Sequence, residues 1–308
     1  MTVKSFTYCD GDNIVLAVIA IVFTAFALSL GDALIKQISA DFPLWQVFVM
    51  RSVIAVPVLI TVIKVRNRSG LLIPNNLGWT ALRSLMLTFM WVAYYAALPN
   101  LAFSIAAAAY YTLPLFITLS SALFIGDKVG FKGWIAVTVG FCGVLAILRP
   151  DGNDFNAYAL LPLISAILYA LAMIITRTKC RNEDPLVLSL GLNLSFIVIG
   201  TAATVLIGYW APSGVQTETH SFLLSPWILM AADEWLTMTV LATAIIIGSV
   251  GAAIAYQAGP SSVVSTFDFS YLAFAAVWGL VFFAEVPDAI TITGIIMIAA
   301  AGILAVRR

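Results

Sequence analysis

Long, continuously apolar runs divide the chain into ten segments, which short stretches with charges, prolines or glycines separate. Each run holds about 20 residues, the length that a helix needs to cross a bilayer core of about 30 Å. The runs do not alternate between apolar and polar positions, which favours helices over a membrane barrel. The ten predicted helices are Asn13–Ser39, Leu44–Val65, Leu77–Leu98, Leu101–Ile125, Phe131–Leu148, Tyr158–Thr178, Pro185–Trp210, Trp235–Gln257, Ser261–Ala284 and Ala289–Val306.

The composition agrees with this pattern. The 308 residues are 62% hydrophobic and 10% charged, with a mean hydropathy of +1.04. Soluble domains are about half apolar and about a quarter charged, and ten spans leave no room for a further domain. The sequence therefore predicts an all-α integral membrane protein. In the one long loop, 211–234, the apolar stretch SFLLSPWILMAA is expected at the membrane interface, or alternatively as part of the eighth span.

Basic residues predict how the chain is oriented in the membrane, because cytoplasmic loops carry an excess of Lys and Arg. With a cytoplasmic N-terminus, eleven basic residues fall on the inner side and two on the outer, which leaves Arg51 and Arg83 inside spans. We therefore expect a multi-pass protein of the cytoplasmic (inner) membrane with both termini in the cytoplasm.

An internal repeat divides the chain into two five-helix halves. The segment GDKVGFKGWIAVTVGFCGVLAILR, ending at Arg149, parallels AEVPDAITITGIIMIAAAGILAVRR, ending at Arg308, and ALPNLAFS parallels AGPSSVVS, with Pro99 opposite Pro260. Because five is odd, the halves, 1–149 and 150–308, enter the membrane from opposite sides. Inverted repeats of this kind are typical of alternating-access carriers, which bind substrate between the halves.

Several kinds of partner are not expected. Equal numbers of basic and acidic residues, 15 of each, leave no basic patch for nucleic acid. One histidine and three scattered cysteines give no metal-ligand pattern. The sequence has no G-x-x-x-x-G-K-[ST] motif, so ATP is not expected to be the direct energy source. We expect no cofactor, and partners limited to a small-molecule substrate and lipids, in a monomer or a homodimer.

The sequence resembles the drug/metabolite transporter superfamily, and its EamA family in particular. The resemblance is carried by GDALIK in the first helix, Arg51 in the second, Leu82–Arg83 in the third and AYYTLPLF in the fourth. The closing run FDFSYLAFAAVWGLVFFAEVPDAITITG resembles the subgroup that includes S-adenosylmethionine and riboflavin uptake proteins. The resemblance implies a ten-helix carrier of small metabolites. Asp127 departs from the family, which usually has Glu at this helix end.

Ionisable side chains inside the predicted spans are the first candidates for a site, because each costs about 2.5–3.5 kcal/mol there. Asp32 and Lys36 lie one turn apart and can form an ion pair on one helix face. Asp32 is equally suited to pair with Arg51 of the second helix. Arg51 offers a flat fork of donors that matches a carboxylate or a phosphate. Arg83 lies near the inner end of its helix, where its long side chain can reach the cytoplasmic surface. Asp32, Lys36 and Arg83, together with Asp268 of the ninth helix, are predicted to form charge pairs or to couple transport.

Asp268 is the remaining charge within a span, and it is the best candidate for a titrating or cation-binding group, with Tyr271 one turn further on. Aromatic side chains accompany the charges, and Pro114 must leave a backbone carbonyl of the fourth helix free. Aromatic rings hold flat heterocycles by stacking and cations through their faces. The predicted substrate-binding residues are Arg51, Trp91, Tyr94, Tyr110, Tyr111, Tyr169, Asn193, Asp268 and Tyr271.

These features predict a secondary transporter for a small polar, zwitterionic or heterocyclic metabolite that works by alternating access. Proton coupling and exchange both stay open, and so does the direction of transport. A membrane-embedded enzyme acting on lipids is the first alternative, but it would need a cluster of catalytic charges near one interface. A non-transporting scaffold and a channel are the others. A channel would need polar rings at one level, which the scattered charges do not supply.

Overall fold

The computed structural model describes residues 13–66, 72–124, 131–148, 156–210 and 221–306, and in these ranges the regular elements are helices. Cys9, Asp127 and His220 lie outside these ranges. The helices are α1 (Ile14–Ile38), α2 (Leu44–Arg66), α3 (Leu77–Ala97), η1 (Leu98–Asn100), α4 (Phe103–Tyr110), α5 (Leu113–Phe124), α6 (Phe131–Leu148), η2 (Ala157–Ala159), α7 (Leu160–Thr178), α8 (Pro185–Trp210), α9 (Ser221–Leu224), α10 (Ala232–Ala258), α11 (Ser261–Asp268), α12 (Ser270–Phe283) and α13 (Ala289–Val306).

Seven helical stretches of the described residues are long and apolar enough to cross a membrane. They comprise α1, α2, α3 with η1, η2 with α7, α8, α10 and the α11–α12 pair, and two shorter apolar stretches cover 103–117 and 289–301. Several predicted boundaries agree with the structure to the residue, because an apolar run ends abruptly at a charge, a proline or a glycine. An all-helical membrane protein is thus supported.

Two of the predicted helices are not continuous, and in this respect the prediction was wrong. The fourth breaks at Tyr111–Thr112, between α4 and α5, and the ninth breaks at Phe269, between α11 and α12. Pro114 explains the first break, since it has no N–H to donate to the carbonyl of Tyr110 one turn earlier. The second break has no proline nearby, and the residues there are Asp268, Phe269 and Ser270. Both breaks fall within the apolar part of the chain, next to the residues of the candidate site.

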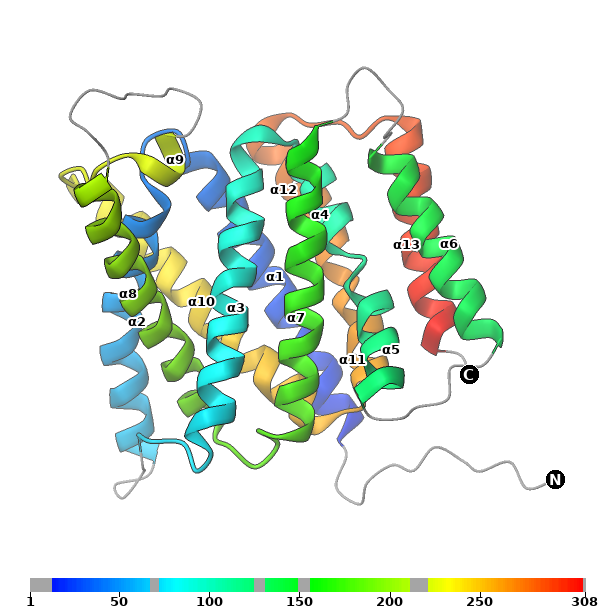
Figure 1. Ribbon diagram of the computed structural model, residues 1–308, viewed down its shortest axis with the longest axis horizontal. Coiled ribbons are helices and arrows are strands. Elements are labelled where there is room, and N and C mark those ends of the chain that lie inside the picture. Colours follow the sequence, from blue (N-terminus) through cyan, green and yellow to red (C-terminus); the bar gives the residue numbers. More distant parts are fainter. Residues whose placement is uncertain (1–12, 67–71, 125–130, 149–155, 211–220, 307–308) are drawn as a thin grey trace.

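Helix pairs from distant parts of the chain build the bundle (Figure 1). Extensive contacts join α1 to α10, α3 to α7, α2 to α8, and α6 to α13. Small residues permit the close approach of α1 and α10: a Cβ at Gly251 would overlap the hydroxyl of Thr24. In lipid, where apolar side chains gain little by leaving their surroundings, close backbone packing of this kind stabilises helix pairs.

The connections between the helices form two faces of the bundle (Figure 1). We call "lower face" the side where α2 ends and α3 begins, and "upper face" the opposite side, where α1 ends and α4 begins. The α9 segment lies at the upper face. Its chain is held to the start of α2, because Trp45 donates to the carbonyl of Leu223 and Gln46 exchanges two hydrogen bonds with Ile228. This segment therefore precedes the eighth span instead of extending it, since α10 begins only at Ala232.

Candidate functional site

A cluster of tyrosines fills the interior between α1, α3, α4, α7, α10 and α12. All its side chains are buried, and most are linked by ring contacts or hydrogen bonds. We call it the tyrosine cluster, and its members are Tyr94, Tyr95, Tyr110, Tyr111, Tyr169, Tyr256 and Tyr271. Phenol rings combine an apolar body with a polar tip, so they can pack against apolar side chains and still bond a buried charge.

Asp32 of α1 is the charge at the centre of the tyrosine cluster. The hydroxyl of Tyr95 donates to one carboxylate oxygen at 2.8 Å, and the hydroxyl of Tyr271 donates to the other at 2.5 Å. The hydroxyls of Tyr94 and Tyr271 are 3.2 Å apart, and because Tyr271 uses its proton on Asp32, Tyr94 is the donor of this pair. The expected local pair between Asp32 and Lys36 was wrong, because tyrosines from α3 and α12 take both carboxylate oxygens.

Arg51 of α2 reaches Asp32 only through Tyr95. Its Nη1 donates to the hydroxyl of Tyr95 at 3.5 Å, and its guanidinium carbon lies 4.7 Å from the centre of the Phe196 ring and 4.9 Å from that of Phe48. Its Nε and Nη2 have no hydrogen-bond partner among the described residues, although Arg51 is only 2% exposed. A buried donor without a partner costs about 1–3 kcal/mol, and more when it is charged. The fork of Arg51 is thus open to a ligand.

Asp268, the last residue of α11, lies on the other side of the tyrosine cluster. Tyr111 donates to its Oδ1 at 3.3 Å, and the Tyr111 ring stacks on that of Tyr271 with their centres 4.8 Å apart. Tyr256 of α10 lies close to the same carboxyl group without reaching hydrogen-bond geometry. The Oδ2 atom of Asp268 has no partner in the described part of the chain. Asp268 and Tyr271 were expected on one helix face, but the break at Phe269 lets them bond different partners.

A buried polar chain therefore crosses the site. It runs from Arg51 through Tyr95, Asp32 and Tyr271 by hydrogen bonds, and the stacked Tyr111 ring carries it on to Asp268. The inner members are satisfied, whereas the cationic and the carboxylate end both keep unpaired polar atoms. The three charged residues are at most 3% exposed, so the site is closed to both faces of the protein.

Other predicted site residues line the same region. Trp91 stacks on Tyr95 with ring centres 5.0 Å apart, and Tyr110 contacts the rings of Tyr94, Tyr111 and Tyr169. Of the predicted aromatic residues, none lies away from this cluster.

Asn193 of α8 is buried too, but its one hydrogen bond to a described residue stays within its own helix and goes to the carbonyl of Ser189. Its share in the site stays a prediction.

Arg83 does not extend to the surface as expected. It is 1% exposed, and its Nε donates to the Thr176 hydroxyl at 2.7 Å while Nη1 reaches the carbonyl of Leu188 at 3.5 Å. Helices α7 and α8 cover it and supply these acceptors, so burial leaves the guanidinium bonded. A cavity of about 20 Å³, enough for one water, is lined by Arg83, Tyr169 and Trp91 among others.

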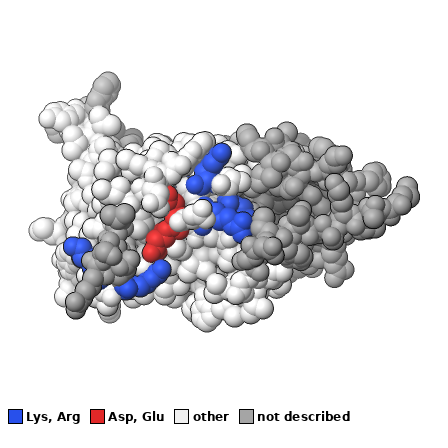
Figure 2. Space-filling model, turned by 90° about the horizontal axis from the view of Figure 1, so that it is seen from below, with Lys and Arg blue, Asp and Glu red and all other residues white. Residues whose placement is uncertain are grey.

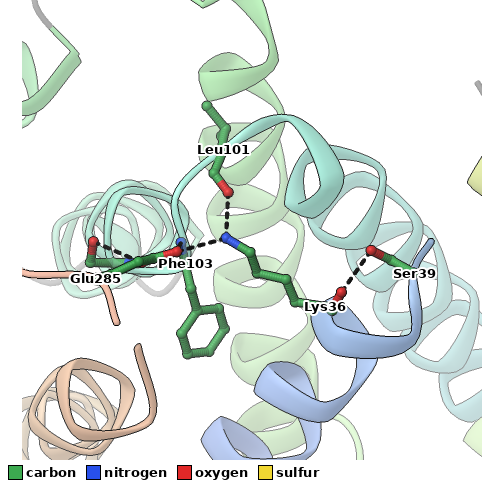
Figure 3. Close-up of polar contacts among 6 residues, drawn as sticks. Lys36, Ser39, Leu101, Phe103 and Glu285 are labelled. Atoms are coloured by element: carbon green, nitrogen blue, oxygen red, sulfur yellow. Dashed lines mark hydrogen bonds and ion pairs between the residues drawn. The ribbon is translucent and has the colours of Figure 1, made fainter. Parts of the chain in front are cut away.

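Lys36 pairs with a residue that the sequence did not single out, Glu285, which follows α12 (Figure 3). Lys36 Nζ lies 2.8 Å from Glu285 Oε1 and donates to the carbonyl of Leu101 at 2.7 Å. Glu285 also accepts from the backbone N–H groups of Phe103 and Ser104, at the start of α4. Burial alone would raise the pKa of Glu285, but the hydrogen bonds from Lys36, Phe103 and Ser104 hold that pKa below its usual value.

A second carboxylate makes a comparable contact at the lower face. Glu183, in the turn after α7, is buried and accepts from the backbone N–H groups of Asn75 and Asn76, where α3 begins. The side chain of Gln257 donates to the carbonyls of Cys180 and Glu183 and ties the end of α10 to the same turn. Each face thus has a buried or half-buried carboxylate that accepts from backbone N–H groups at, or just before, the start of a helix bearing site residues.

The sequence alone missed Tyr95, Tyr256, Phe196 and Glu285. Tyr95 directly follows Tyr94, and the helical spacing of the third span favoured its neighbour. Tyr256 ends the small-residue run GSVGAAIAY, which drew attention only as a packing surface. Glu285 stands out only through its repeat counterpart, the acid in GDKVGF.

Comparison with known proteins shows which proteins this chain resembles. Residues 15–149 match the EamA-like transporter family, which confirms the family resemblance inferred from the sequence. One solved crystal structure aligns with a TM-score of 0.69 at 17% identity, over 95% of this chain and 98% of that one, which supports the same fold.

Particular relatives are named as transporters. A riboflavin transporter of Rhizobium johnstonii is 29% identical over 71% of this chain, an alignment that spans 65% of that protein. The pseudopaline exporter CntI of Pseudomonas aeruginosa is 24% identical over 92% of this chain and 93% of that protein. An S-adenosylmethionine uptake transporter of Rickettsia bellii is 26% identical over 70% of this chain and 68% of that protein. Together they support a membrane metabolite transporter.

The contacts of Glu285 predict an acid-sensitive contribution to stability. Because its folded-state pKa is lowered, this contribution is complete above the unfolded pKa of about 4.3 and is lost as pH falls through the folded value. At pH 7, Glu285→Gln should lower the free energy of unfolding by about 1–3 kcal/mol. Thermal unfolding of both proteins in detergent, from pH 7 to pH 3.5, should show the difference narrowing below about pH 4.3.

The exposed Asp41, on the same face, provides the control. Asp41→Asn should change the melting temperature little at any pH in this range. A deficit in Glu285→Gln that stayed constant down to pH 3.5 would mean that the charge of Glu285 does not stabilise the fold.

Proposed function

We propose that this protein is a secondary transporter that carries a small polar, zwitterionic or heterocyclic metabolite across the membrane by alternating access. The observation that carries the proposal is the buried polar chain with two unsatisfied ends, at Arg51 and Asp268. Intramembrane charges without partners are expensive and typically mark a substrate path. A ligand with an anionic and a cationic group would satisfy both ends, and the tyrosine cluster between them would hold its apolar or aromatic part.

The arrangement of helix contacts favours ten passages in two inverted repeats, 1–149 and 150–308. If α1 corresponds to α7 and α3 to α10, the contact of α1 with α10 is the counterpart of that between α3 and α7. The contacts of α2 with α8 and of α6 with α13 join direct counterparts. The two broken helices are the fourth and the ninth passage, which correspond as well. This pairing supports alternating access by rocking one half against the other.

The described basic residues favour a cytoplasmic lower face in the inner membrane, with both termini in the cytoplasm. Figure 2 views the lower face, where basic side chains surround acidic ones. Five basic residues lie at the lower ends of α2 and α7 or in the turn after α7, whereas Lys36, at the upper end of α1, is paired. The five are Lys64, Arg66, Arg177, Lys179 and Arg181.

A labelling experiment tests this orientation. In a variant without native cysteines, Asp41→Cys at the upper face should react with an impermeant maleimide in intact cells. Asn182→Cys at the lower face should react only after lysis, because the reagent cannot cross the membrane. Both positions are exposed to solvent, so a difference in labelling reports the side of the membrane on which each lies. The opposite pattern would place the termini outside.

The names of the relatives suggest substrates to test. S-adenosylmethionine has a carboxylate, cationic centres and an adenine ring, so it would suit Arg51, Asp268 and the tyrosine cluster together. Riboflavin offers a flat ring system without a charge, and pseudopaline is the third probe. A thermal-shift screen with these compounds, followed by uptake into proteoliposomes, tests the proposal. Mass spectrometry of the accumulated compound separates transport from the alternative of a membrane-embedded enzyme, which would return it chemically changed.

Arg51→Lys is the sharpest test of the anionic end. Lysine keeps the charge but loses the planar fork, and the loss of one charge-assisted pair weakens binding about 10- to 100-fold. We expect uptake of the best probe to fall by at least about tenfold at low concentration, with normal expression and melting temperature. Arg66→Lys, at the exposed end of α2, should transport normally. Wild-type uptake by Arg51→Lys would show that a fork of donors is not needed.

Asp268 is the proposed coupling residue, because a carboxylate in this position must bind a proton or a cationic group during the cycle. Asp268→Asn keeps the size and most hydrogen bonding of the side chain but cannot ionise. This variant should lose accumulation driven by a pH gradient in proteoliposomes, while exchange of a neutral probe such as riboflavin continues. Equal gradient-driven accumulation by wild type and variant would assign coupling to another group, with Asp32 the next candidate.

A further inference from the structure

The contacts of Glu285 join three separate parts of the chain at the upper face (Figure 3). Its carboxylate accepts from Lys36 Nζ at 2.8 Å, from the N–H groups of Phe103 at 2.9 Å and Ser104 at 3.1 Å, and from the Ser104 hydroxyl at 3.3 Å. Lys36 bonds in turn to the carbonyl of Leu101. We call this set of contacts the upper junction. Its residues come from the end of α1, the start of α4 and the turn after α12, and it therefore links the first half of the chain to the second.

The upper junction stands over the candidate site. Lys36 lies one turn from Asp32 on α1, and Ser104 lies about two turns from Tyr111, at the end of α4. Helix α12, which the junction follows, carries Tyr271. The three elements held together at the upper face therefore each contribute a side chain to the polar chain below. A path from the upper face to the site that runs between α1, α4 and α12 would have to separate at least one pair of these elements.

The backbone before Glu285 is bent to make this contact. Ala284 adopts a left-handed conformation with φ 51°, the one positive φ of a residue other than glycine in the described chain. This bend ends α12, with the N–H of Glu285 bonded to the carbonyl of Gly279. A side chain with a Cβ is disfavoured there, so the surrounding contacts must hold the bend in place.

We propose that the upper junction is the gate that closes the site toward the upper face. While Glu285 caps α4 and binds Lys36, the ends of α1, α4 and α12 stay together and the site is sealed. Release of the carboxylate frees α4, a short helix that the break at Tyr111 already separates from α5. The inference goes one step beyond the proposed transport activity, and labelling can test it without any substrate.

Glu285 has two tasks in this gate, and that distinguishes it from a simple ion pair. It neutralises Lys36, and it also accepts hydrogen bonds at the positive end of α4, where a carboxylate is favoured and an ammonium is not. Exchanging the two charges, Lys36→Glu with Glu285→Lys, would restore an ion pair but would place a cation against the N–H groups of Phe103 and Ser104. The gate should therefore stay open in the exchanged protein.

The accessibility of a cysteine below the junction measures the state of the gate. Ala107 is buried on α4, three residues from Ser104 and four from Tyr111. In a protein with Cys9, Cys142 and Cys180 replaced by serine, Ala107→Cys is placed in nanodiscs, where a soluble maleimide reaches both faces. Glu285→Gln should increase its rate of labelling about tenfold or more, since a charge-assisted contact is lost. Lys36→Met, which leaves the cap on α4, should increase it less, and the exchanged protein should label as fast as Glu285→Gln.

Glu183→Gln is the matched control, because it removes a carboxylate at the lower face that also accepts from two backbone N–H groups next to the start of a helix. It should leave the labelling of Ala107→Cys unchanged. A second reporter, Met173→Cys, lines the cavity beside Arg83 and should not label faster when Glu285 is replaced. Unchanged labelling of Ala107→Cys in Glu285→Gln, an equal rise with Glu183→Gln, a parallel rise at Met173→Cys, or slow labelling of the exchanged protein would each overturn the gate.

These outcomes are independent of whether transport itself is found. A protein that gates as expected but moves none of the three probes would leave the gate standing and count against the choice of substrate. If the protein transports well but Ala107→Cys labels at the same rate in every variant, the gate proposal is contradicted and the proposed transport function is not.

Discussion

The burial of charge within a membrane is the constraint on which the rest of this structure depends. Arg51 and Asp32 face each other across α1, α2 and α3, and the single hydroxyl of Tyr95 connects them. A hydroxyl can accept from the guanidinium and donate to the carboxylate, so one tyrosine bridges the two charged groups without direct contact between them. Tyr271 of α12 donates the second hydrogen bond to the carboxylate of Asp32, and this bond joins the two halves of the chain at their centre.

The same constraint explains why the helices break where they do. A straight ninth helix would hold Asp268 and Tyr271 on one face. The breaks let α12 carry Tyr271 to Asp32 while Asp268 stays with Tyr111. Irregular backbone in a membrane is tolerated only where protein or a water-filled cavity surrounds it, and the buried site meets that condition.

Much of the fold could be predicted because its strongest signals are local. Apolar runs end abruptly, so Pro185–Trp210 and Ala289–Val306 were predicted to the residue. The expense of intramembrane charge singled out Arg51, Asp32 and Asp268 before any contact was known.

Which residue each buried charged side chain bonds to was not predictable, because it depends on how the helices are rotated about their axes and where they break. The sequence offers Lys36, one turn from Asp32, as a partner for that carboxylate, yet Lys36 bonds to Glu285, 249 residues further on. The position of Arg83 near a helix end predicts that it reaches the surface, but α7 and α8 cover it and accept its hydrogen bonds. Tyr256 carried no signal beyond its residue type. Local spacing identifies the groups that need partners, and only the packing of the helices assigns them.

A structure of the protein with the probe that raises its melting temperature most tests directly whether Arg51 and Asp268 bind opposite ends of one substrate. We predict an anionic group within hydrogen-bond distance of Nε or Nη2 of Arg51. The cationic end should lie against Oδ2 of Asp268, and the body of the ligand should contact the tyrosine cluster. A probe bound elsewhere, with both ends of the polar chain still unpaired, would contradict this account.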